Sequence, residues 1–331
     1  MKKIYVLSKA IFATTLMLSM GLTSMAHDFE VNGIYYGYVN KVDKTVKVTF
    51  QGSAYDSYAD EYTGAITIPS SVTFSGVTYS VTTIGKDAFR ECSGVTSVTI
   101  PKSVTEVMYN AFYNTQWYKN QPDGVMYLGD CCLGIKGANP TGAINIKNGT
   151  RLIANTAFSV CNKITDVTIP NTVTHIGTEA FYACRKLTKL PLPESLISIG
   201  AYAFQECSGL TDITFPNSVS YIGAFAIYNC TGLTSIQSLN PTPPTCVEGS
   251  LYNCYNLPLI VADGSAEKYA NALEWKKFTN IQEAGINNIE ADKNAVEVSR
   301  YDINGRQLSQ PTTGINIIKM SDGTTKKIIV K

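Results

Sequence analysis

The chain has 331 residues, enough for one large domain or two of ordinary size, and its 44% of apolar residues excludes a disordered chain. Charged residues make up only 16%, below the roughly 25% of an average globular domain. Three of the 27 basic residues lie in the first 26 positions, so the remainder of the chain has 24 basic and 26 acidic residues. This balance does not predict the clustered positive charge of a nucleic-acid-binding surface.

The first 26 residues predict a secretory signal peptide. Lys2 and Lys3 supply the positive start, and an apolar run follows over residues 11–22. Ser24 and Ala26 are the small residues of a cleavage site, which we place after Ala26. No segment reaches the ~18 apolar residues of a membrane-spanning helix. We therefore expect a secreted protein, at the outer cell surface or extracellular, without a membrane span; a buried N-terminal helix is the less favoured alternative.

Residues 27–63 predict a small β-structured cap. An Asn32-Gly33 turn separates two apolar segments, and residues 46–50 alternate between apolar and polar side chains. Residues 55–62 then place three tyrosines among acidic residues. Exposed tyrosines would contact a protein or a sugar, whereas buried ones would pack on the part of the chain that follows, which we favour.

The centre of the chain repeats itself at a fixed period. Segments of the form I-G-x-x-A-F begin at residues 84, 107, 153, 176, 199 and 222, with intervals of 23 residues throughout except for one of 46. Self-similarity of this kind is the sequence signature of a repeat architecture, in which each unit stacks on its neighbours.

Most units have a second half made of a cysteine, three aliphatic positions and a proline. The clearest examples span residues 92–101, 161–170, 184–193 and 207–216. The last two aliphatic positions are two residues apart and share one side of a short strand, which the proline ends. The predicted fold is an α/β repeat solenoid of the leucine-rich type over residues 64–262, with one short parallel strand in each 23-residue unit. The I-G-x-x-A-F half should form a turn or helical piece on the convex side.

This pattern resembles the BspA-like leucine-rich-repeat family of bacterial surface proteins, whose unit reads close to I-G-x-x-A-F-x-x-C-x-x-L-x-x-I-x-I-P-x-x-V. The resemblance covers well over half of the mature chain and is specific for the fold. It implies a secreted or surface-attached protein of Gram-negative anaerobes, and some members of the family resemble adhesins for extracellular-matrix proteins of a host.

Two places depart from the repeat. Residues 125–137 replace one I-G-x-x-A-F half and predict a hairpin that turns at Gly129-Asp130, with Trp117 and Tyr118 packed beneath it. Residues 240–245 are an insertion before the last unit. Each departure is either a binding feature or tolerated loop variation.

Residues 263–282 predict a capping helix that covers the last repeat. Ser265 is a suitable N-cap, with Glu267 in the first turn. Residues at helical spacing supply its apolar side, with two aromatic residues beyond them to complete the cap: Ala266, Tyr269, Ala270, Leu273, Trp275 and Phe278.

Residues 283–331 predict a linker and a β-rich tail. The tail resembles the C-terminal sorting domain read by the type IX secretion system, in which G-x-x-I-I-K and a K-x-I-V-K ending recur. The matching residues are Gly314, Ile317, Ile318, Lys319, Gly323, Lys327, Ile329, Val330 and Lys331. The alternative is an ordinary two-stranded extension.

Five of the nine cysteines lie in register with the repeat: Cys92, Cys161, Cys184, Cys207 and Cys230. An oxidising compartment favours disulfides. However, stacked side chains would hold their Cβ atoms ~5 Å apart, wider than a disulfide allows. We favour a ladder of buried free thiols. No C-x-x-C pair points to zinc, and we expect no metal and no cofactor.

Nothing in the sequence assembles a catalytic site, so we do not expect an enzyme. A Ser-His-Asp triad would have to use His27 or His175, and the residue at the position of His175 differs from one repeat to the next. Paired carboxylates could serve a glycosidase, and Asp166, Glu179 and Asp212 occupy repeat positions, but no pattern places them in a cleft.

The candidate site is a stripe of outward-facing residues on the repeat strands, expected on the concave face. Its members are Ser97, Thr99, Asp166, Thr168, Lys189, Asp212, Thr214, Ser235 and Gln237, with Pro191 beside them. A mostly neutral stripe suits an extracellular or host protein, and we expect protein–protein interaction or adhesion; a glycan bound for nutrient capture is the alternative. The alternative is that threonine recurs in the stripe because of its strand propensity and not because it binds a partner.

Overall fold

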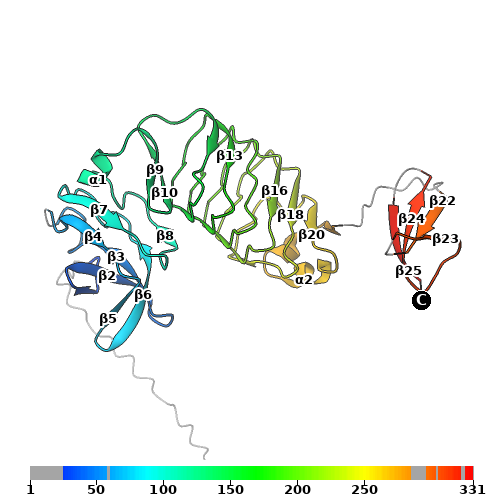
Figure 1. Cartoon of the computed structure of the whole chain (residues 1–331), viewed down its shortest axis with the longest axis horizontal. Coiled ribbons are helices and arrows are strands. Elements are labelled where there is room, and N and C mark those ends of the chain that lie inside the picture. Colours follow the sequence, from blue (N-terminus) through cyan, green and yellow to red (C-terminus); the bar gives the residue numbers. More distant parts are fainter. Residues whose placement is uncertain (1–24, 58–59, 285–295, 303–304, 322–324, 331) are drawn as a thin grey trace, which may run out of the picture.

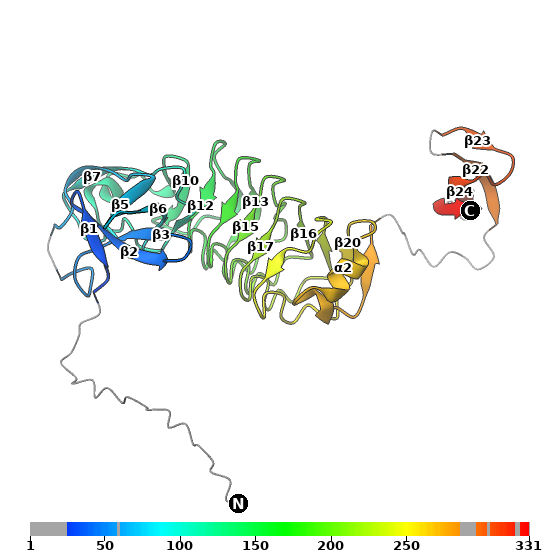
Figure 2. The same cartoon turned by 90° about the horizontal axis from the view of Figure 1, so that it is seen from below.

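The structure, a computed structural model, describes residues 25–57, 60–284, 296–302, 305–321 and 325–330. Its main body is a solenoid that runs from an N-terminal sheet to a short helix near residue 270, as Figures 1 and 2 show from two sides. Nearly all of the predicted signal peptide, Tyr58, residues 285–295, Gly323 and Lys331 lie outside the described residues. Within the described part, no helix is long and apolar enough to cross a membrane.

The N-terminal cap is a mixed sheet. Its strand order is β1-β2-β3-β6-β5, with β8 also paired to β6. The strands are β1 (Phe29–Val31), β2 (Ile34–Asn40), β3 (Thr45–Thr49), β5 (Ser71–Phe74), β6 (Val77–Ile84) and β8 (Glu106–Val107). Ser75 and Gly76 both have positive φ, as a tight hairpin turn requires, so β5 and β6 form a hairpin. The cap sheet therefore extends beyond residue 63, where the repeat pattern had placed its end.

The solenoid fold is confirmed, and most regular units contribute two strands rather than one. The first ladder is the expected one, built from strands in the aliphatic half and paired in parallel. It contains β4 (Gly64–Thr67), β7 (Val95–Thr99), β11 (Gly142–Asn145), β13 (Ile164–Thr168), β16 (Asp212–Phe215), β18 (Ser235–Ser238), β20 (Leu259–Val261) and β21 (Ile281–Glu283).

The second ladder lies at the start of the I-G-x-x-A-F half, where the sequence had indicated only a turn or a helical piece. Its two-residue strands pair in parallel with residues 23 positions away, as His175 does with Ser198, except for the last pair, in which Tyr221 and Thr245 are 24 positions apart. The members are β12 (Leu152–Ile153), β14 (His175–Ile176), β15 (Ser198–Ile199), β17 (Tyr221–Ile222) and β19 (Thr245–Cys246).

The I-G-x-x-A-F halves stack so closely that glycine is required in them. A Cβ on Gly200 would lie 2.4 Å from the amide nitrogen of Thr178 and 2.5 Å from the carbonyl carbon of Gly177, both main-chain atoms of the preceding unit. The phenylalanines stack along the same axis, with ring centroids of Phe158 and Phe181 5.2 Å apart. These rings are fully buried and form the column around which the solenoid packs.

The first departure from the repeat is the expected hairpin, β9 (Gly124–Leu128) with β10 (Cys131–Lys136), whose inner strand joins the second ladder through β12. It is preceded by the single-turn helix α1 (Gln116–Lys119), capped by the Thr115 hydroxyl. Lys136 Nζ donates to three carbonyls at the end of this turn, those of Tyr118, Lys119 and Gln121. The aromatic pair Trp117–Tyr118 is thus joined to the hairpin, as the sequence predicts.

The C-terminal end of the solenoid is closed by α2 (Ala266–Asn271) and the 3-10 turn η1 (Trp275–Lys277). Tyr269 and Trp275 are fully buried and Phe278 nearly so, but Leu273 is 58% exposed because the helix ends before it. Ser265 makes no side-chain capping bond; its hydroxyl donates to the carbonyl of Ala262 instead.

Residues 240–245 pack against this cap. The Trp275 indole donates to the carbonyl of Pro244 at 2.9 Å, and the Tyr269 hydroxyl donates to that of Asn240 at 2.7 Å. These bonds give the insertion a structural role.

The tail forms its own antiparallel sheet, in the order β23-β22-β24-β25. The strands are β22 (Glu297–Tyr301), β23 (Gln307–Leu308), β24 (Gly314–Met320) and β25 (Thr325–Val330). The guanidinium of Arg300 is buried between the carboxylate of Glu297 and the side-chain oxygen of Asn316. This is a four-stranded unit, larger than a two-stranded extension.

Candidate functional site

Parallel register brings most of the predicted stripe together. Asp166 lies opposite Lys189 through a single β-bridge. Further along, Asp212 and Thr214 lie opposite Ser235 and Gln237. Each of these residues is at least partly exposed, while the intervening residues Val167, Ile213 and Ile236 are buried. The alternation of buried and outward side chains is the one expected from the sequence.

The stripe is not one continuous face, and here the prediction needs correction. Ser97 and Thr99 lie on β7, which pairs in the described part of the chain with β4 alone, in a separate two-stranded sheet. The next unit places the helix α1 where its strand would be, and α1 packs against β7 instead. Ser97 and Thr99 are therefore separated from the other seven residues.

A second break follows Lys189. In this unit the outward position after Leu190 is Pro191, which has no amide hydrogen to donate. Among the described residues, no backbone hydrogen bond joins residues 188–192 to residues 211–215, although Val167 still donates to the carbonyl of Lys189 at 3.3 Å. The sheet is open on one side of β16.

This opening is a groove with a volume of about 530 Å³. Its walls are residues 188–192 on one side and 211–214 on the other, with Glu194 and Pro216 at the ends. Lys189 and Asp212, two of the three charged stripe residues, both line it. The repeat pattern had placed these residues correctly on the outside, but it gave no reason to expect a groove; the one signal was the proline at position 191.

Hydroxyl groups on this face are largely engaged within the protein. Thr188 donates to the carbonyl of Thr165 at 3.2 Å, and Thr234 donates to that of Thr211 at 3.0 Å. The carboxylate of Asp212 accepts from the Thr211 hydroxyl at 3.0 Å. These threonines flank the stripe and stabilise the stacking of strands. Within the stripe, Thr214 donates to the side-chain oxygen of Gln237 at 3.4 Å. Lys189 and Asp212, which line the groove, are the stronger candidates for contact with a partner.

The titratable groups do not form a recognisable catalytic arrangement. Burial and the nearby charge of Arg151 lower the pKa of His175, and its Nδ1 is 2.7 Å from the Thr174 hydroxyl, with no carboxylate bonded to it. Within the described ranges, no group of three or more His, Cys, Asp or Glu side chains is arranged to hold a metal ion.

The cysteines form the predicted ladder of thiols. All nine are buried and unpaired. In the regular repeats each Sγ lies within hydrogen-bond distance of the main-chain carbonyl of the phenylalanine in the preceding unit, at 3.1 Å for Cys184 and 3.0 Å for Cys207 and Cys230. Burial raises the pKa of Cys161 and Cys230 to about 12. These cysteines are core residues.

The tyrosines after residue 54 pack on the first repeat where they are described. Tyr62 is 2% exposed, donates to the carbonyl of Thr49 at 2.6 Å and packs against Phe89. Tyr55 lies under the guanidinium of Arg90, which is 4.1 Å from the ring centroid. Tyr62 is thus confirmed as a packing residue, and Tyr55 packs against Arg90 while remaining partly exposed.

Comparison with known proteins agrees with the repeat. The family described as BspA type leucine rich repeat region matches residues 65–133 and 137–258 in six copies. No curated protein matches the chain in sequence.

Solved structures with a similar fold are bacterial leucine-rich repeat proteins. One from Bacteroides ovatus is 20% identical, with 78% of this chain and 77% of that chain covered and a TM-score of 0.32. A leucine rich cell surface protein from Faecalibacterium prausnitzii is 26% identical, with coverage of 67% and 56% and a TM-score of 0.27. One from Eubacterium ventriosum is 17% identical, with coverage of 70% and 82% and a TM-score of 0.35.

These TM-scores are well below 0.5, so the assignment rests on the repeat itself, which matches over more than half of the chain. Together with the stacked 23-residue units, the phenylalanine column and the thiol ladder, that match leads to one conclusion. The chain belongs to the BspA type leucine-rich repeat family.

Proposed function

We propose that this protein is secreted and binds another extracellular protein, such as a host surface or matrix protein, through the seven stripe residues that follow the hairpin: Asp166, Thr168, Lys189, Asp212, Thr214, Ser235 and Gln237. The observation that carries the proposal is the groove in the sheet beside β16, with Lys189 on one wall and Asp212 on the other. A groove with both signs of charge and open backbone edges suits the mixed polar surface of a protein.

The same features argue against other partners. Asp166 and Asp212 are acidic and Lys189 is the one basic residue in the stripe, so a phosphate backbone would meet net negative charge. The stripe carries no aromatic side chain on which a sugar ring could stack. A protein surface is therefore favoured over nucleic acid and over a glycan at this position.

Location outside the cell is part of the proposal and is supported by the sequence. The N-terminal segment has the three parts of a signal peptide, and the tail carries the G-x-x-I-I-K pattern in β24. We propose that the tail sheet is a sorting unit of the type IX kind. Removal of residues 296–331 should then leave the protein in the periplasm of its native host, detected by cell fractionation.

The binding test compares two triple variants of the purified protein. Asp166→Ala/Lys189→Ala/Asp212→Ala removes the stripe charges, and Asp56→Ala/Lys102→Ala/Glu267→Ala removes the same number of each sign from exposed positions elsewhere. Both are measured by surface plasmon resonance against immobilised extracellular-matrix proteins, and the parent is also tested on a glycan array.

We expect saturable binding to at least one protein, weakened tenfold or more by the stripe variant and unchanged by the control. Equal binding by both variants would show that the stripe is not part of the binding site. Binding to glycans alone would assign the protein to nutrient capture instead.

A further inference from the structure

The I-G-x-x-A-F turns of neighbouring repeats are joined by a regular set of backbone hydrogen bonds. Three amides of one turn donate to three carbonyls of the next, two residues apart each time. Between the turns that start at residues 176 and 199, Glu179 donates to Ala201 at 2.9 Å, Phe181 to Ala203 at 2.8 Å and Ala183 to Gln205 at 2.7 Å. The turns at 84, 153 and 199 donate to their successors in the same pattern.

This pattern stops at the hairpin. The turn at residues 107–114 has the same shape, but in the fully described stretch 60–284 the amides of Asn110, Phe112 and Asn114 donate to no acceptor. On the other side, the carbonyls of Asn155, Ala157 and Ser159 accept from no donor. The strands of the hairpin bond to each other and to β12, and do not supply the turn that would lie between them.

Asn155 holds the two turns together at one end. Its amide donates to the carbonyl of Val107 at 2.9 Å, and its side chain donates to Glu106 at 2.9 Å while accepting from the amide of Thr178 at 2.9 Å. Towards Phe112 and Ser159 no such bond is made. The two turns are therefore hydrogen-bonded to each other at Val107 and diverge beyond that residue.

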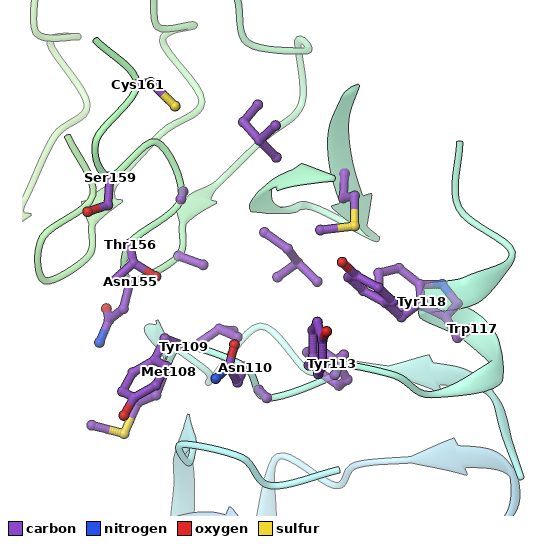
Figure 3. A pocket seen from close by; sticks show the side chains of 18 of the residues that line it. Met108, Tyr109, Asn110, Tyr113, Trp117, Tyr118, Asn155, Thr156, Ser159 and Cys161 are labelled. Carbon is purple, nitrogen blue, oxygen red and sulfur yellow. The ribbon is translucent and has the colours of Figure 1, made fainter. Parts of the chain in front are cut away.

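The space between them is a pocket of about 320 Å³, at the lower end of the roughly 300–1,000 Å³ usual for ligand sites. Figure 3 shows Asn110 and Tyr113 from the first turn facing Asn155, Thr156 and Ser159 from the second. Apolar side chains from the first turn, α1 and the hairpin also line the pocket: Phe112, Trp117, Met126, Leu133 and Ile135. Tyr113 and Tyr118 lie side by side at its edge, with ring centroids 5.2 Å apart.

We propose that this pocket binds a peptide segment of a partner protein, in the conformation and in the position that an I-G-x-x-A-F turn takes elsewhere in the solenoid. Its carbonyls would accept from the amides of Asn110, Phe112 and Asn114, and its amides would donate to the carbonyls of Asn155 and Ser159. The carbonyl of Ala157 lies against the backbone of Gly134 in the hairpin instead. One aromatic or aliphatic side chain would enter the apolar part of the pocket. Addition of a chain to open backbone edges is a general mode of peptide recognition.

The backbone pattern is what favours a peptide over a sugar. One wall presents only donors and the other only acceptors, each at every second residue, which matches the two sides of an I-G-x-x-A-F turn. An extended strand would instead present donors and acceptors in alternation along each edge. Sugar hydroxyls both donate and accept and have no such period. The site is separate from the stripe and does not depend on the function proposed for it.

The probe is a synthetic octapeptide with the sequence of residues 199–206, IGAYAFQE, because this segment forms the required turn in its own repeat. The matched control peptide carries N-methyl groups on the nitrogens that correspond to Tyr202, Phe204 and Glu206, which donate to the following turn. Binding to the full chain is measured by fluorescence anisotropy of the labelled peptides. Hydrogen exchange measures how far the bound peptide protects the amides of Asn110, Phe112 and Asn114.

A blocking variant with a matched control tests the location. Asn110→Tyr introduces the side chain that Tyr202 carries at the equivalent position, where φ is also +57° and the ring stacks on Phe225 of the next repeat. The new ring should therefore reach over the pocket without disturbing the turn. Glu179→Tyr makes the same change where the next turn is present.

We expect saturable binding of the parent peptide, slower exchange at the three amides, and at least a tenfold loss with the methylated peptide or with Asn110→Tyr, but not with Glu179→Tyr. Absence of peptide binding, or equal binding of both peptides, would overturn the proposal. So would protection of the same amides by oligosaccharides instead of the peptide. The triple stripe variant should still bind the peptide, so failure of the stripe proposal is distinguishable.

Discussion

The thiol of Cys207 lies 3.0 Å from the main-chain carbonyl of Phe181 in the preceding repeat. Cys184 and Cys230 make the same contact one unit earlier and one unit later. The carbonyl of Phe181 also accepts from the amide of Cys184 at 3.2 Å, so the thiol is its second donor. Cysteine suits this position because it is small, largely apolar and still able to donate a weak hydrogen bond.

Replacement of Cys207 by alanine should therefore destabilise the protein by about 1–2 kcal/mol, through the lost packing contacts of the sulfur and the loss of the second hydrogen bond to this carbonyl. Cys254→Ala is the matched control, because that thiol is also buried but lies 3.9 Å from the carbonyl of Ile227. Urea unfolding of both variants measures the difference. Equal losses would mean that the hydrogen bond contributes nothing and that packing alone selects cysteine.

The buried thiols should also be unreactive in the folded protein. Burial raises the pKa of Cys131, Cys132 and Cys246 to about 12, so almost no thiolate exists at pH 8. Titration with Ellman's reagent should find no fast-reacting cysteine in the native protein and all nine after unfolding in guanidinium. Fewer than nine in the unfolded, unreduced protein would reveal disulfides and contradict the ladder.

The glycine of the I-G pair should be among the least replaceable residues. Gly200→Ala would place its Cβ 2.4 Å from the amide nitrogen of Thr178, and neither backbone can move without shifting a whole unit. We expect a loss of about 3 kcal/mol, at the upper end for overpacking. Gly37→Ala is the control, because its nearest contacts would be the flexible Lys47 side chain at 3.0 Å and one carbonyl oxygen at 3.1 Å. Thermal unfolding compares the two, and similar melting temperatures would refute the close-stacking argument.

The 23-residue period was sufficient to predict the solenoid, because it also sets the register. Any residue pairs with its counterpart one unit away, as Ser198 does with Tyr221, so the outward residues of the stripe could be identified from spacing alone. The phenylalanine and cysteine columns follow from the same rule. Local pattern and tertiary packing agree in these units, which is the condition under which sequence specifies structure.

The prediction failed where a unit departs from the period. The helical turn at Gln116–Lys119 and the missing turn bonds of Asn110 arise in the irregular unit, where the periodic pattern no longer constrains packing. The break after Lys189 arises inside a regular unit, at the one that carries Pro191 in its strand position. Both candidate sites therefore lie at interruptions of the repeat, which a consensus pattern does not describe.

Stability should fall as the pH rises from about 4.5 to 7 because of Glu61. Its carboxylate accepts from the amide of Gln51 at 2.8 Å, but half-burial at the cap raises its pKa from 4.5 to about 7. Between these values the folded state holds a proton that the unfolded state has lost, so this group favours folding less and less as the pH increases. Above pH 7 the folded protein carries a poorly solvated charge.

Glu61→Gln removes that charge and keeps an acceptor for the Gln51 amide. The variant should be more stable than the parent by about 1 kcal/mol at pH 8, a value reduced from the full shift because the group is partly exposed to solvent, and equal to it at pH 4. Urea unfolding at the two pH values measures both differences. Asp56→Asn, at an exposed position nearby, should change neither. If Glu61→Gln is instead less stable at pH 8, the carboxylate is favourable in its charged form, and the raised pKa is contradicted.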